Sequence, residues 1–588
     1  MWLLVALVWA GVGLSRMWFG LRTWAESDVP VYMRARSQGY EPYYGTDGAR
    51  GAVSCELDVC SNVGVYLLDK GGSAADAVIG VASCVGAIDL FHSGIGGGGF
   101  ALVKTHGNDP IMLDYRETAP AQAHRDVFVG MPANASIFGG LAAAVPGEVR
   151  GWEQLHKLYG RLPWHEILAP VVTITRRGFR VPSQLYDRLL LFEGPICEDS
   201  ALGRIYCPHG RLVQTGEVIR LPDLARTYEA IARHGPDAMY AGPIAERMVK
   251  AVQAAGGIMT MDDLRSYRVM VRMARSITYR NAYRIWATSM PSSGSVVLSA
   301  LKTMEHFPDM PYDPHDALHT HRLIEATKYA YGERTRFGDP AFVWNMTDME
   351  NRMVSAENAK TRFRSIRDAY VHPVEEYDPL QLDIVSDRGT SHMNVVDQDG
   401  MAIAATTTIN GIWGSTVLTP DGILMNNDMD DFSSPDRSNQ FGYVPSHPNF
   451  IVPGKRPLSS MSPIMVENRH TGALELIVGS SGGSRIITAN ILTAYAYLSH
   501  HGQVSMDDVI ARPRWHDQLL PPVTVFEYPG AQTPGFDNAT VRALTAKGHR
   551  AAYTAPGLSN AQAIQHTHAG LWHAASERRQ YEARGAAI

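Results

Sequence analysis

Residues 389–410 read GTSHMNVVDQDGMAIAATTTIN. Two β-rich runs in this stretch, 393–397 and 401–407, flank the turn sequence QDG and predict a β-hairpin. The preceding segment, residues 370–388, carries two prolines and several acids without a helical period, so we interpret it as exposed and mobile. Thr390 therefore stands where a mobile segment meets the first strand of a sheet.

Thr390 carries the strongest chemical signal in the chain. A threonine hydroxyl is a poor nucleophile without an adjacent base, and one compact solution is a threonine whose own α-amine is that base. A free α-amine has a pKa of about 7.7–8.0, so much of it is neutral near physiological pH. An internal threonine gains such an amine only when the preceding bond is cut. Because Gly389 has no Cβ, its carbonyl is open to the Thr390 hydroxyl, and self-cleavage between the two residues is the hypothesis.

The composition is that of an ordinary globular protein. Of the 588 residues, 45% are hydrophobic and 19% are charged. The net charge of −6 and the lack of a long basic block argue against nucleic acid as a partner. Residues 61–90 predict two close-packed helices, and 140–340 predict a mainly helical region. The final third is rich in β signals, with hairpins expected at 465–478 and 561–575 and a helix at 486–498.

Two motif matches lack the context that their chemistry needs. The glycine tract at 94–99 contains G-x-G-x-x-G, but a dinucleotide fingerprint needs a strand before it and a helix after it. Here a helix precedes the glycines and a strand at 101–104 follows them, so close backbone packing near a site is the better interpretation. His315 and His319 have zinc-ligand spacing, but Asp316 stands where the motif needs Glu. We expect a structural or surface role for both histidines.

The sequence GSSGG at 479–483 supports two different chemistries. It matches G-x-S-x-G, and a strand before it and a helix after it give Ser481 the context of a hydrolase nucleophile elbow. Asp517 and several histidines could complete a triad, but the spacing singles out none of them. The backbone N–H groups of Gly482 and Gly483, at a helix start, would instead stabilise a developing negative charge. We favour this oxyanion role, and a serine hydrolase using Ser481 is the alternative.

The first residues of the chain predict a secretory route. Residues 1–13 read MWLLVALVWAGVG and contain no charge. This run is shorter than the roughly 17–25 residues that a membrane span needs, and it fits the apolar region of a signal peptide. The rivals are a signal anchor reaching to Trp24, a wrong or truncated start, and a plain buried helix. We expect residues 1–24 to be a signal peptide or signal anchor, and the mature protein to be secreted or held at the extracellular face of the plasma membrane.

The cysteines agree with an oxidising compartment. Cys60 and Cys84 flank one predicted helix, and Cys197 and Cys207 close a short loop. We therefore expect two disulfides with Cys55 left over, and five buried free thiols are the alternative. Three N-x-[ST] sequons are candidate glycosylation sites and support secretion weakly: Asn134, Asn345 and Asn538.

Eight segments stand out between residues 60 and 581: GGSAADAV, SGIGGGGF, DYRETAP, AVPGEVRGW, GTSHMNVVDQDGMAIAATTTIN, NNDMDDFSSP, KRPLSSMSP and VGSSGGSRI. Together they resemble the gamma-glutamyltransferase (gamma-glutamyl transpeptidase, glutathione hydrolase) family, especially its animal members. The resemblance implies an α/β fold, a four-layered αββα N-terminal-nucleophile hydrolase sandwich. It also implies that the precursor cuts itself into a large subunit, residues 25–389, and a small catalytic subunit, residues 390–588, which stay together as a heterodimer.

The resemblance assigns the catalytic machinery to four positions. Thr390 matches the new N-terminal nucleophile, and Thr408 matches the residue that hydrogen-bonds and supports it. Gly482 and Gly483 match the oxyanion hole, in agreement with the interpretation of this glycine pair above. His392 shares a strand face with Thr390, but a shared face does not place the imidazole on the hydroxyl, so we favour a structural role for His392.

The resemblance assigns substrate binding to residues that recognise a zwitterion. Arg116, in DYRE, matches the arginine that grips the α-carboxylate of the γ-glutamyl group, and a guanidinium can pair with a carboxylate through two parallel hydrogen bonds. Ser459 and Ser460 match the serine pair that adds hydroxyl donors to that carboxylate. Asn410 and Asp431 match ligands of the α-amino group, which needs acceptors and negative charge.

The chain departs from the family pattern at two places. Asp428 stands where animal members usually carry Glu and many bacterial members Gln, so we expect its contact with the α-amine to be looser or water-bridged. After Asn410 the family often has Thr-Tyr-Phe, whereas this chain has Gly411-Ile412-Trp413. In the family the missing Tyr lies close to the site entrance, so we expect acceptor preference to differ.

The resemblance implies acyl transfer on small-molecule substrates. Thr390 would attack the γ-glutamyl amide of glutathione or its S-conjugates, and water, an amino acid or a dipeptide would then take the acyl group. The resemblance implies no metal and no organic cofactor. The alternative of a different class is a catalytically silent homologue that acts as a surface binding protein, although the nucleophile and pocket positions carry competent residues.

Overall fold

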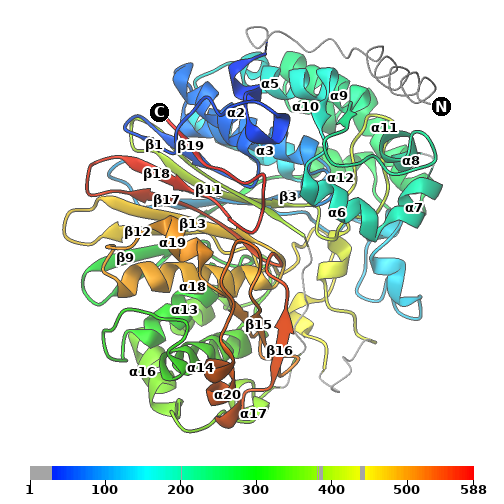
Figure 1. Ribbon diagram of the computed structural model, residues 1–588. Coiled ribbons are helices and arrows are strands. Elements are labelled where there is room, and N and C mark those ends of the chain that lie inside the picture. The colour runs from blue at the N-terminus through cyan, green and yellow to red at the C-terminus, as the bar shows by residue number, and fades with distance from the viewer. Residues whose placement is uncertain (1–28, 200, 381, 383–388, 437–443) are drawn as a thin grey trace, which may run out of the picture.

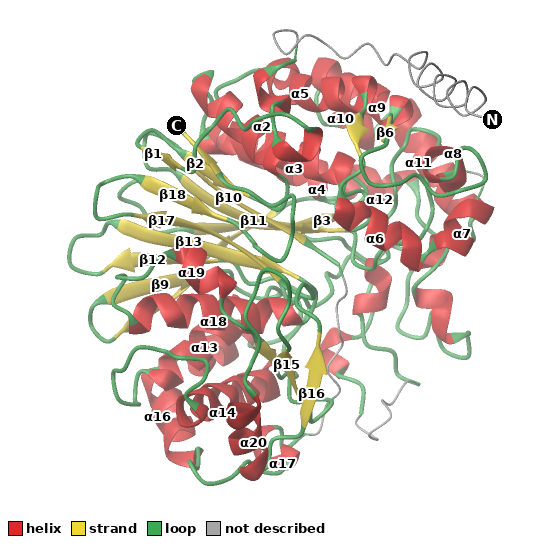
Figure 2. Cartoon of the chain, in the orientation of Figure 1, coloured by secondary structure: helices red, strands yellow, loops and turns green. Residues whose placement is uncertain are grey.

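Two antiparallel sheets of seven strands each lie face to face in the middle of the molecule, and helices cover both outer faces (Figure 1, Figure 2). The computed structural model describes residues 29–199, 201–380, 382, 389–436 and 444–588. The expected four-layered αββα sandwich, an α/β fold, is confirmed.

Both sheets combine strands from the two sides of Thr390. The first sheet has the order β19 (Ala586–Ala587), β2 (Ala52–Ser54), β10 (Ser391–Val396), β11 (Ala402–Thr408), β3 (Gly98–Lys104), β4 (Ile111–Tyr115) and β7 (Met270–Met273). The second sheet has the order β1 (Asp47–Gly48), β18 (Trp572–Ala575), β17 (Asn560–His566), β13 (Leu474–Ser481), β12 (Ile464–Asn468), β9 (Tyr283–Ala287) and β8 (Arg275–Tyr279). The two halves of the chain are thus hydrogen-bonded to each other within both sheets.

The central hairpin forms as predicted. β10 and β11 pair antiparallel, with His392 opposite Thr406. Successive strand residues point to opposite faces, so Ala404 packs between the sheets while Ile403 packs against the helices. Thr406 and Thr408 share the face of Ala404. The register of this hairpin therefore aims both threonines between the two sheets. The other predicted hairpins form as β12–β13 and β17–β18.

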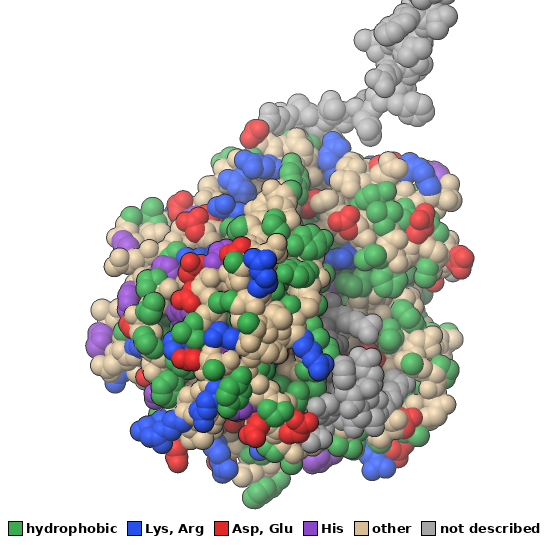
Figure 3. Space-filling view, turned by 60° about the horizontal axis from the view of Figure 1, so that its bottom comes forward, with side chains coloured by type: hydrophobic (Ala, Val, Ile, Leu, Met, Phe, Trp, Pro, Cys, Tyr) green, Lys and Arg blue, Asp and Glu red, His purple; other side chains and the backbone are tan. Residues whose placement is uncertain are grey.

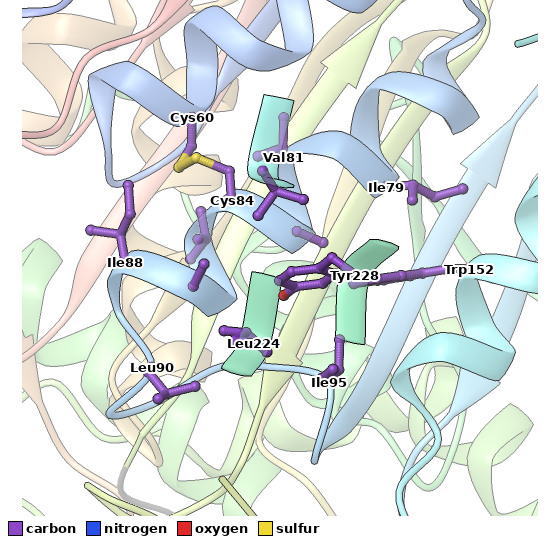
Figure 4. Packing of buried hydrophobic residues seen from close by; sticks show 14 of the residues in the cluster. Cys60, Ile79, Val81, Cys84, Ile88, Leu90, Ile95, Trp152, Leu224 and Tyr228 are labelled. Atoms are coloured by element: carbon purple, nitrogen blue, oxygen red, sulfur yellow. A yellow bond between two sulfur atoms is a disulfide. The ribbon is translucent and has the colours of Figure 1, made fainter. Parts of the chain in front are cut away.

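One helical layer covers the first sheet (Figure 1). It contains α2 (Asp58–Asp69), α3 (Ala74–Ile88), α5 (Trp164–Arg177) and α9 (Pro222–His234). A disulfide between Cys60 and Cys84 joins α2 to α3 within the apolar cluster of this layer (Figure 4). The second expected disulfide, Cys197–Cys207, also forms, and Cys55 is free and buried. Both pairings are confirmed, although the first links two helices instead of the two ends of one.

The motif GGSAADAV explains where α3 begins. Ser73 is its N-cap: the hydroxyl oxygen accepts from the Asp76 backbone N–H at 3.3 Å, and the Asp76 carboxylate accepts from the Ser73 backbone N–H at 2.9 Å. This capping box satisfies two backbone donors that the helix start would otherwise leave unpaired. The cap fixes the start of a helix that is buried along its whole length.

The second helical layer covers the other sheet. It contains α13 (Gly294–Met304), α14 (Ala317–Arg334) and α18 (Arg485–Ser499), the last of which matches the predicted helix at 486–498. The remaining helices are α4 (Glu148–Tyr159), α6 (Ser183–Leu191), α7 (Glu193–Glu198), α8 (Leu202–Tyr206), α10 (Asp237–Tyr240), α11 (Pro243–Ala254), α12 (Met261–Ser266), α15 (Met346–Met353), α16 (Ala356–Ser365), α17 (Val374–Tyr377), α19 (Met506–Ala511) and α20 (Asn538–Ala546). Two small sheets complete the fold, β14 (Trp515–His516) with β15 (Thr524–Glu527) and β16 (Ala551–Thr554), and β5 (Phe179–Arg180) with β6 (Val218–Ile219).

Two expectations need correction. The mainly helical region at 140–340 also contains β7, β8 and β9; β7 and β8 are edge strands, and β9 lies between β8 and β12. Most residues of β7 are exposed, so it shows no apolar and polar alternation that could reveal a strand. The segment 370–388 is not simply exposed, because Tyr377 is buried and donates its hydroxyl to Glu325 at 2.5 Å. Residues 381 and 383–388 of this segment lie outside the described residues.

The predicted signal peptide or anchor, residues 1–24, lies outside the described residues. Within the described part of the chain, no helix combines the length and the apolar character needed to cross a membrane. Acidic and basic side chains are interspersed on the face that Figure 3 shows.

Candidate active site

Thr390 lies directly before β10 and is buried at the edge of a cavity. The backbone N–H of Gly482 donates to Thr390 Oγ1 at 3.0 Å. Gly482 follows β13 with φ +120°, and a Cβ there would lie 2.4 Å from the Leu558 carbonyl oxygen. Gly483 follows with φ +61°. Both positions therefore favour glycine, and the turn they form brings a backbone donor onto the threonine hydroxyl.

The peptide bond before Thr390 is held by Thr408. The Thr408 hydroxyl donates to the Gly389 carbonyl oxygen at 2.5 Å and accepts from the Asn410 backbone N–H at 2.7 Å. A Cβ on Gly389 would lie 2.5 Å from the Asn410 carbonyl oxygen. Residue 389 therefore has to be glycine because another backbone segment lies too close for a side chain. This is a second reason for glycine, besides the access to its carbonyl that the sequence suggested.

The glycine tract packs against the same strand. A Cβ on Gly97 would lie 1.8 Å from the Thr408 carbonyl oxygen, and one on Gly99 would lie 2.0 Å from the Thr406 carbonyl oxygen. β3 therefore begins inside the glycines, at Gly98, earlier than the predicted 101–104. The interpretation of this tract as close backbone packing near a site is confirmed.

A charged pocket, which we define as Arg116, Glu117, Asp428 and Asp431, lies beside this strand. Arg116 follows β4, is 1% exposed, and its backbone carbonyl accepts from the Tyr267 hydroxyl at 2.7 Å. Arg116 Nη1 lies 2.6 Å from Asp428 Oδ1, and its Nη2 pairs with Asp431. Both aspartates come from one short 3-10 helix, η6 (Asp428–Asp431). The structure thus brings together the predicted ligands of the two opposite charges of a zwitterion.

Glu117 is a member of this pocket that the sequence analysis missed. Its side chain is fully buried and lies 3.4 Å from Arg116 Nη1. Burial raises the pKa of Glu117 from 4.5 to about 7, and the Arg116 charge opposes that shift. The signal was present in DYRE, where an acid directly follows the arginine, but adjacency in sequence does not show that both side chains point inward.

Asparagines connect the charged pocket to the threonines and to the serine pair. Asn410 Nδ2 donates to the Asn427 carbonyl oxygen at 3.1 Å, directly before Asp428. On the other side, Asn449 Nδ2 donates to the Asp431 carbonyl oxygen at 2.7 Å, and its Oδ1 accepts from the Leu458 backbone N–H at 3.0 Å. Hydrogen bonds at both ends of η6 therefore tie it to Asn410 next to Thr408 and, through Asn449, to the segment that carries the serines.

Ser459 and Ser460 are both buried and are held by residues that carried no sequence signal. Arg334 Nη2 donates to Ser460 Oγ at 3.2 Å, and Arg334 Nε donates to Ser293 Oγ at 2.9 Å. The Ser293 hydroxyl in turn donates to the Ser459 carbonyl oxygen at 2.5 Å. Arg334 and Ser293 belong to the second helical layer, so this layer positions the serine pair.

His392 and Ser481 are not joined to Thr390 in a catalytic relay. His392 Nδ1 lies 2.8 Å from Thr406 Oγ1 and its Nε2 lies 2.9 Å from Asn394 Oδ1, while burial lowers the pKa of His392 to about 4. These contacts favour the structural role. Asp517 accepts from the Thr524 hydroxyl at 2.6 Å, and no histidine hydrogen-bonds to Ser481 within the described ranges of the chain. A triad on Ser481 therefore gains no support from the geometry.

The two histidines with zinc-ligand spacing have separate partners. His315 pairs with Asp537 at 2.8 Å, and His319 Nε2 lies 2.6 Å from the Tyr495 hydroxyl oxygen. The expected structural or surface role of both is confirmed.

A cavity of about 790 Å³ opens beside Thr390. Thr390, Ile412, Ser481, Gly482 and Arg485 are among the residues that line it. None of the four residues of the charged pocket is among the described residues that line this cavity. A small molecule reaching Thr390 from this cavity would meet the hydroxyl and the Gly482 N–H together.

The αββα sandwich with a threonine at the start of a central strand places the protein in the class of N-terminal-nucleophile hydrolases. The family profile described as gamma-glutamyltranspeptidase matches residues 60–587. The chain belongs to the gamma-glutamyltranspeptidase family. Its particular kinship with animal members, expected from the motifs, stays a prediction.

Known relatives agree in sequence and in fold. The chain is 39% identical to a glutathione hydrolase proenzyme of Arthroderma benhamiae, with 96% of each chain covered, and 40% identical to a glutathione hydrolase of Aspergillus flavus, with 88% of this chain and 85% of the relative covered. A cephalosporin acylase of Bacillus halodurans shares the fold with a TM-score of 0.78 at 24% identity, covering 92% of this chain and 96% of the acylase. Helicobacter pylori gamma-glutamyltranspeptidase aligns with a TM-score of 0.52 at 29% identity, covering 54% of this chain and 92% of that chain.

Proposed function

We propose that this protein is a self-activating γ-glutamyltransferase that hydrolyses glutathione and its S-conjugates or transfers their γ-glutamyl group to an amino acid or dipeptide. The support is the family membership, the names of relatives at 39% and 40% identity, and a site that pairs a threonine nucleophile with a pocket for a zwitterion.

The observation that carries the proposal is the pair of hydrogen bonds around the Gly389–Thr390 bond. The Thr408 hydroxyl donates to the Gly389 carbonyl oxygen at 2.5 Å, and the Gly482 N–H donates to Thr390 Oγ1 at 3.0 Å. A donor on a carbonyl oxygen favours attack at its carbon. These contacts polarise the bond to be cut and hold the hydroxyl beside it.

Self-cleavage follows from this arrangement. Thr390 Oγ attacks the Gly389 carbonyl carbon, the C–N bond breaks, and an ester forms between the two residues. Water then hydrolyses the ester, which leaves a carboxylate on Gly389 and a free α-amine on Thr390. The products are the large subunit, residues 25–389, and the small subunit, residues 390–588. The strand pairs β2–β10, β3–β11 and β9–β12 cross between them and keep the heterodimer together.

Turnover uses the new amine as base. The amine takes the Thr390 hydroxyl proton while Oγ attacks the γ-glutamyl carbonyl, and it returns the proton to the leaving amine. The Gly482 and Gly483 N–H groups stabilise the oxyanion, and loss of one such donor typically lowers the rate about 10²–10³-fold. Water or an acceptor amine then attacks the acyl-threonine ester.

Specificity lies in the two ends of the zwitterion. Arg116 with Ser459 and Ser460 binds the α-carboxylate, and Asp431 with its neighbours Asp428 and Asn410 binds the α-ammonium. Without substrate, Arg116 pairs with both aspartates. An incoming zwitterion supplies one carboxylate and one ammonium, so it replaces these ion pairs without leaving a net buried charge. A ligand with only one of the two charges would leave part of the pocket unpaired.

We also propose the secretory route for this protein, with residues 1–24 as signal peptide or anchor. The two disulfides support an oxidising compartment, and the exposed Asn134 and Asn538 are accessible to glycosylation. Treatment with a glycosidase that removes N-linked sugars should increase gel mobility, and surface labelling of intact cells should distinguish an anchored from a released product.

The deciding experiment compares Thr390→Ala with Ser481→Ala. We expect Thr390→Ala to remain a single uncut chain without γ-glutamyl anilide hydrolysis, and Ser481→Ala to mature and turn over. N-terminal sequencing of the smaller wild-type band should begin at Thr390. An active wild-type protein made of one uncut chain would overturn the proposal, and loss of activity only in Ser481→Ala would favour the serine hydrolase. Complete maturation without turnover would favour the silent homologue.

A further inference from the structure

Arg485 occupies a distinct position in the active-site cavity. It is the first residue of α18, two residues after Gly483, and it lines the same cavity as Thr390 and Gly482. The residues of the charged pocket are buried and are not among the described residues that line this cavity.

The guanidinium of Arg485 is half-buried and unpaired. Burial lowers the pKa of Arg485, and Tyr331 and Glu527 affect it only through longer-range attraction. In the described part of the chain, no group forms a hydrogen bond or an ion pair with this guanidinium. A partly desolvated cation without a partner is unfavourable unless a ligand supplies one.

Two neighbouring arginines, in contrast, are paired with carboxylates. Arg579, which lines the same cavity, pairs with Glu527 at 2.6 Å and with Glu577 at 2.9 Å. Arg514 is buried nearby and pairs with Glu577 at 2.7 Å. Glu527 and Glu577 are thus already engaged with other arginines. Arg485, which lines both this cavity and a smaller pocket beside Glu527 and His516, has no such partner among the described residues.

The proposed reaction indicates which part of the substrate would lie near Arg485. When the γ-glutamyl end sits in the charged pocket, the group on the other side of the scissile amide must extend into the open cavity. In glutathione this group is a dipeptide with a terminal carboxylate, and two extended residues reach about 7 Å. Arg485, two residues beyond Gly483, lines the cavity into which this dipeptide would extend.

We propose that Arg485 is a specificity-determining residue that binds the carboxylate of the leaving dipeptide and, in the transfer reaction, of the incoming amino acid or dipeptide. The inference rests on the proposed γ-glutamyl transfer function. The planar guanidinium suits a carboxylate through two parallel hydrogen bonds, and the amino end of α18 adds a favourable dipole. The enzyme then recognises both ends of its donor, with Arg116 at the γ-glutamyl end and Arg485 at the other.

The test varies the substrate carboxylate and the arginine together. The mature enzyme is assayed with glutathione, with glutathione esterified at its glycine carboxylate, and with γ-glutamyl-p-nitroanilide, whose leaving group has no carboxylate. We expect the wild type to prefer glutathione over its ester by about 10-fold in kcat/KM, as for loss of a charge-assisted hydrogen bond. In Arg485→Gln the preference should vanish, while anilide hydrolysis stays within about threefold of wild type.

Acceptors provide the matching measurement. With the anilide as donor, the wild type should use glycylglycine better than glycylglycinamide, and Arg485→Gln should use the two equally. Arg188→Gln is the control, because Arg188 lines the same cavity from α6. It should keep both wild-type preferences, and their loss in this variant would show that general positive potential, and not a contact with Arg485, selects the carboxylate.

The outcomes separate this inference from the proposed function. Failure of wild-type enzyme to hydrolyse the anilide contradicts the function itself. Hydrolysis of the anilide with equal use of glutathione and its ester overturns the role of Arg485, and so does an unchanged preference in Arg485→Gln. If Arg485→Gln does not mature, the test uses the wild type and Arg485→Lys. The lysine variant should keep only part of the preference for glutathione over its ester. If it kept the full preference, the proposed pair of hydrogen bonds from the guanidinium to the carboxylate would be overturned.

Discussion

The charged pocket and the cavity beside Thr390 differ in how they handle charge. In the pocket, Arg116 is 1% exposed and paired with Asp428 and Asp431. In the cavity, Arg485 is half-buried and unpaired within the described residues. A buried cation needs a permanent partner, whereas a cation at an open wall keeps part of its hydration. The ion pairs of the pocket are therefore in place before substrate arrives, whereas we expect Arg485 to gain a partner only when a carboxylate binds.

This difference predicts strict selectivity for the γ-glutamyl end of the donor and looser selectivity for its leaving group. Opposite charges that are fixed in a buried site need little reorganisation when a matching zwitterion enters. We expect ligands that lack one charge to be rejected, because they would leave a buried group unpaired. At the open wall the penalty for a missing carboxylate is smaller, since water replaces it. We expect a narrow choice at the γ-glutamyl end and a broad choice of leaving groups.

Substitution of Arg116 should have the largest effect. Arg116→Ala leaves Asp428 and Asp431 without their partner, and breaking a buried pair costs about 3–5 kcal/mol. We expect kcat/KM for the anilide to fall at least about 10³-fold, while self-cleavage persists because the contacts at Gly389 and Thr390 do not involve Arg116. Gel analysis and steady-state kinetics measure the two effects.

The matched control for this prediction is Arg272→Ala. Arg272 also pairs with two aspartates, Asp114 at 3.0 Å and Asp339 at 3.3 Å, but it lies on β7 outside the pocket. Arg272→Ala should lower the stability of the protein without a comparable fall in kcat/KM for the anilide. Unchanged apparent donor affinity in Arg116→Ala would contradict the assignment of Arg116 to the α-carboxylate.

The buried acid of the charged pocket gives a pH prediction. Burial raises the pKa of Glu117 from 4.5 to about 7. Below pH 4.5 the group is protonated in both folded and unfolded chains and contributes nothing. Between about pH 4.5 and 7 the unfolded chain is ionised while the folded chain still holds the proton, so the free energy of unfolding falls by up to about 3 kcal/mol and changes no further above pH 7. Glu117→Gln should therefore match wild type in Tm near pH 4.5 and exceed it near pH 8.

Glu217→Gln is the control for that experiment. Glu217 is exposed and its pKa is lowered to about 2 by Arg211, so it stays ionised across this range and should leave the slope of Tm against pH unchanged. An identical slope in Glu117→Gln and wild type would show that Glu117 does not carry the expected penalty.

The fold around Thr390 could be predicted because its signals are local. The QDG turn, the strands on both sides of it and the cap at Ser73 each depend on residues a few positions apart. The position of Gly482 and Gly483 between a strand and a helix could also be predicted, and the oxyanion role of this pair stays a prediction. Such local features do not depend on how the strand and the helix pack against the rest of the protein.

The pairing of charges could not be predicted, because it is set by contacts between distant segments. Arg116 and Asp431 are 315 positions apart, and nothing near either residue indicates the partner. Arg334 lies on a helix of the second layer and reaches Ser460 only because the layer packs there. The unpaired state of Arg485 is likewise invisible in sequence, since it depends on which arginines take Glu527 and Glu577.

A smaller effect is expected from Thr408→Val. This change removes the hydroxyl that donates to the Gly389 carbonyl oxygen, and loss of a hydrogen bond at a developing charge should slow self-cleavage about 10–100-fold. Thr406→Val is the matched control, because Thr406 shares the strand face but contacts His392. The rate at which the uncut chain disappears after synthesis measures both. Equal rates in the two variants would remove Thr408 from the cleavage step.

The smallest effect is expected at Ile412, which lines the cavity. The preceding residue, Gly411, is hydrogen-bonded to Asn427, directly before Asp428 of the charged pocket. Gly411 N–H donates to Asn427 Oδ1 at 2.7 Å, and Trp413 N–H donates to the Phe91 carbonyl oxygen at 2.7 Å, so the backbone on both sides of Ile412 is fixed. Ile412→Tyr can therefore change the cavity wall without moving the pocket. We expect the ratio of transfer to hydrolysis with dipeptide acceptors to change about threefold, with donor KM and self-cleavage unchanged. Ile412→Val should behave as wild type. A changed donor KM in Ile412→Tyr would mean that the pocket and the cavity are coupled through this loop, and the two regions could then no longer be treated as independent binding sites.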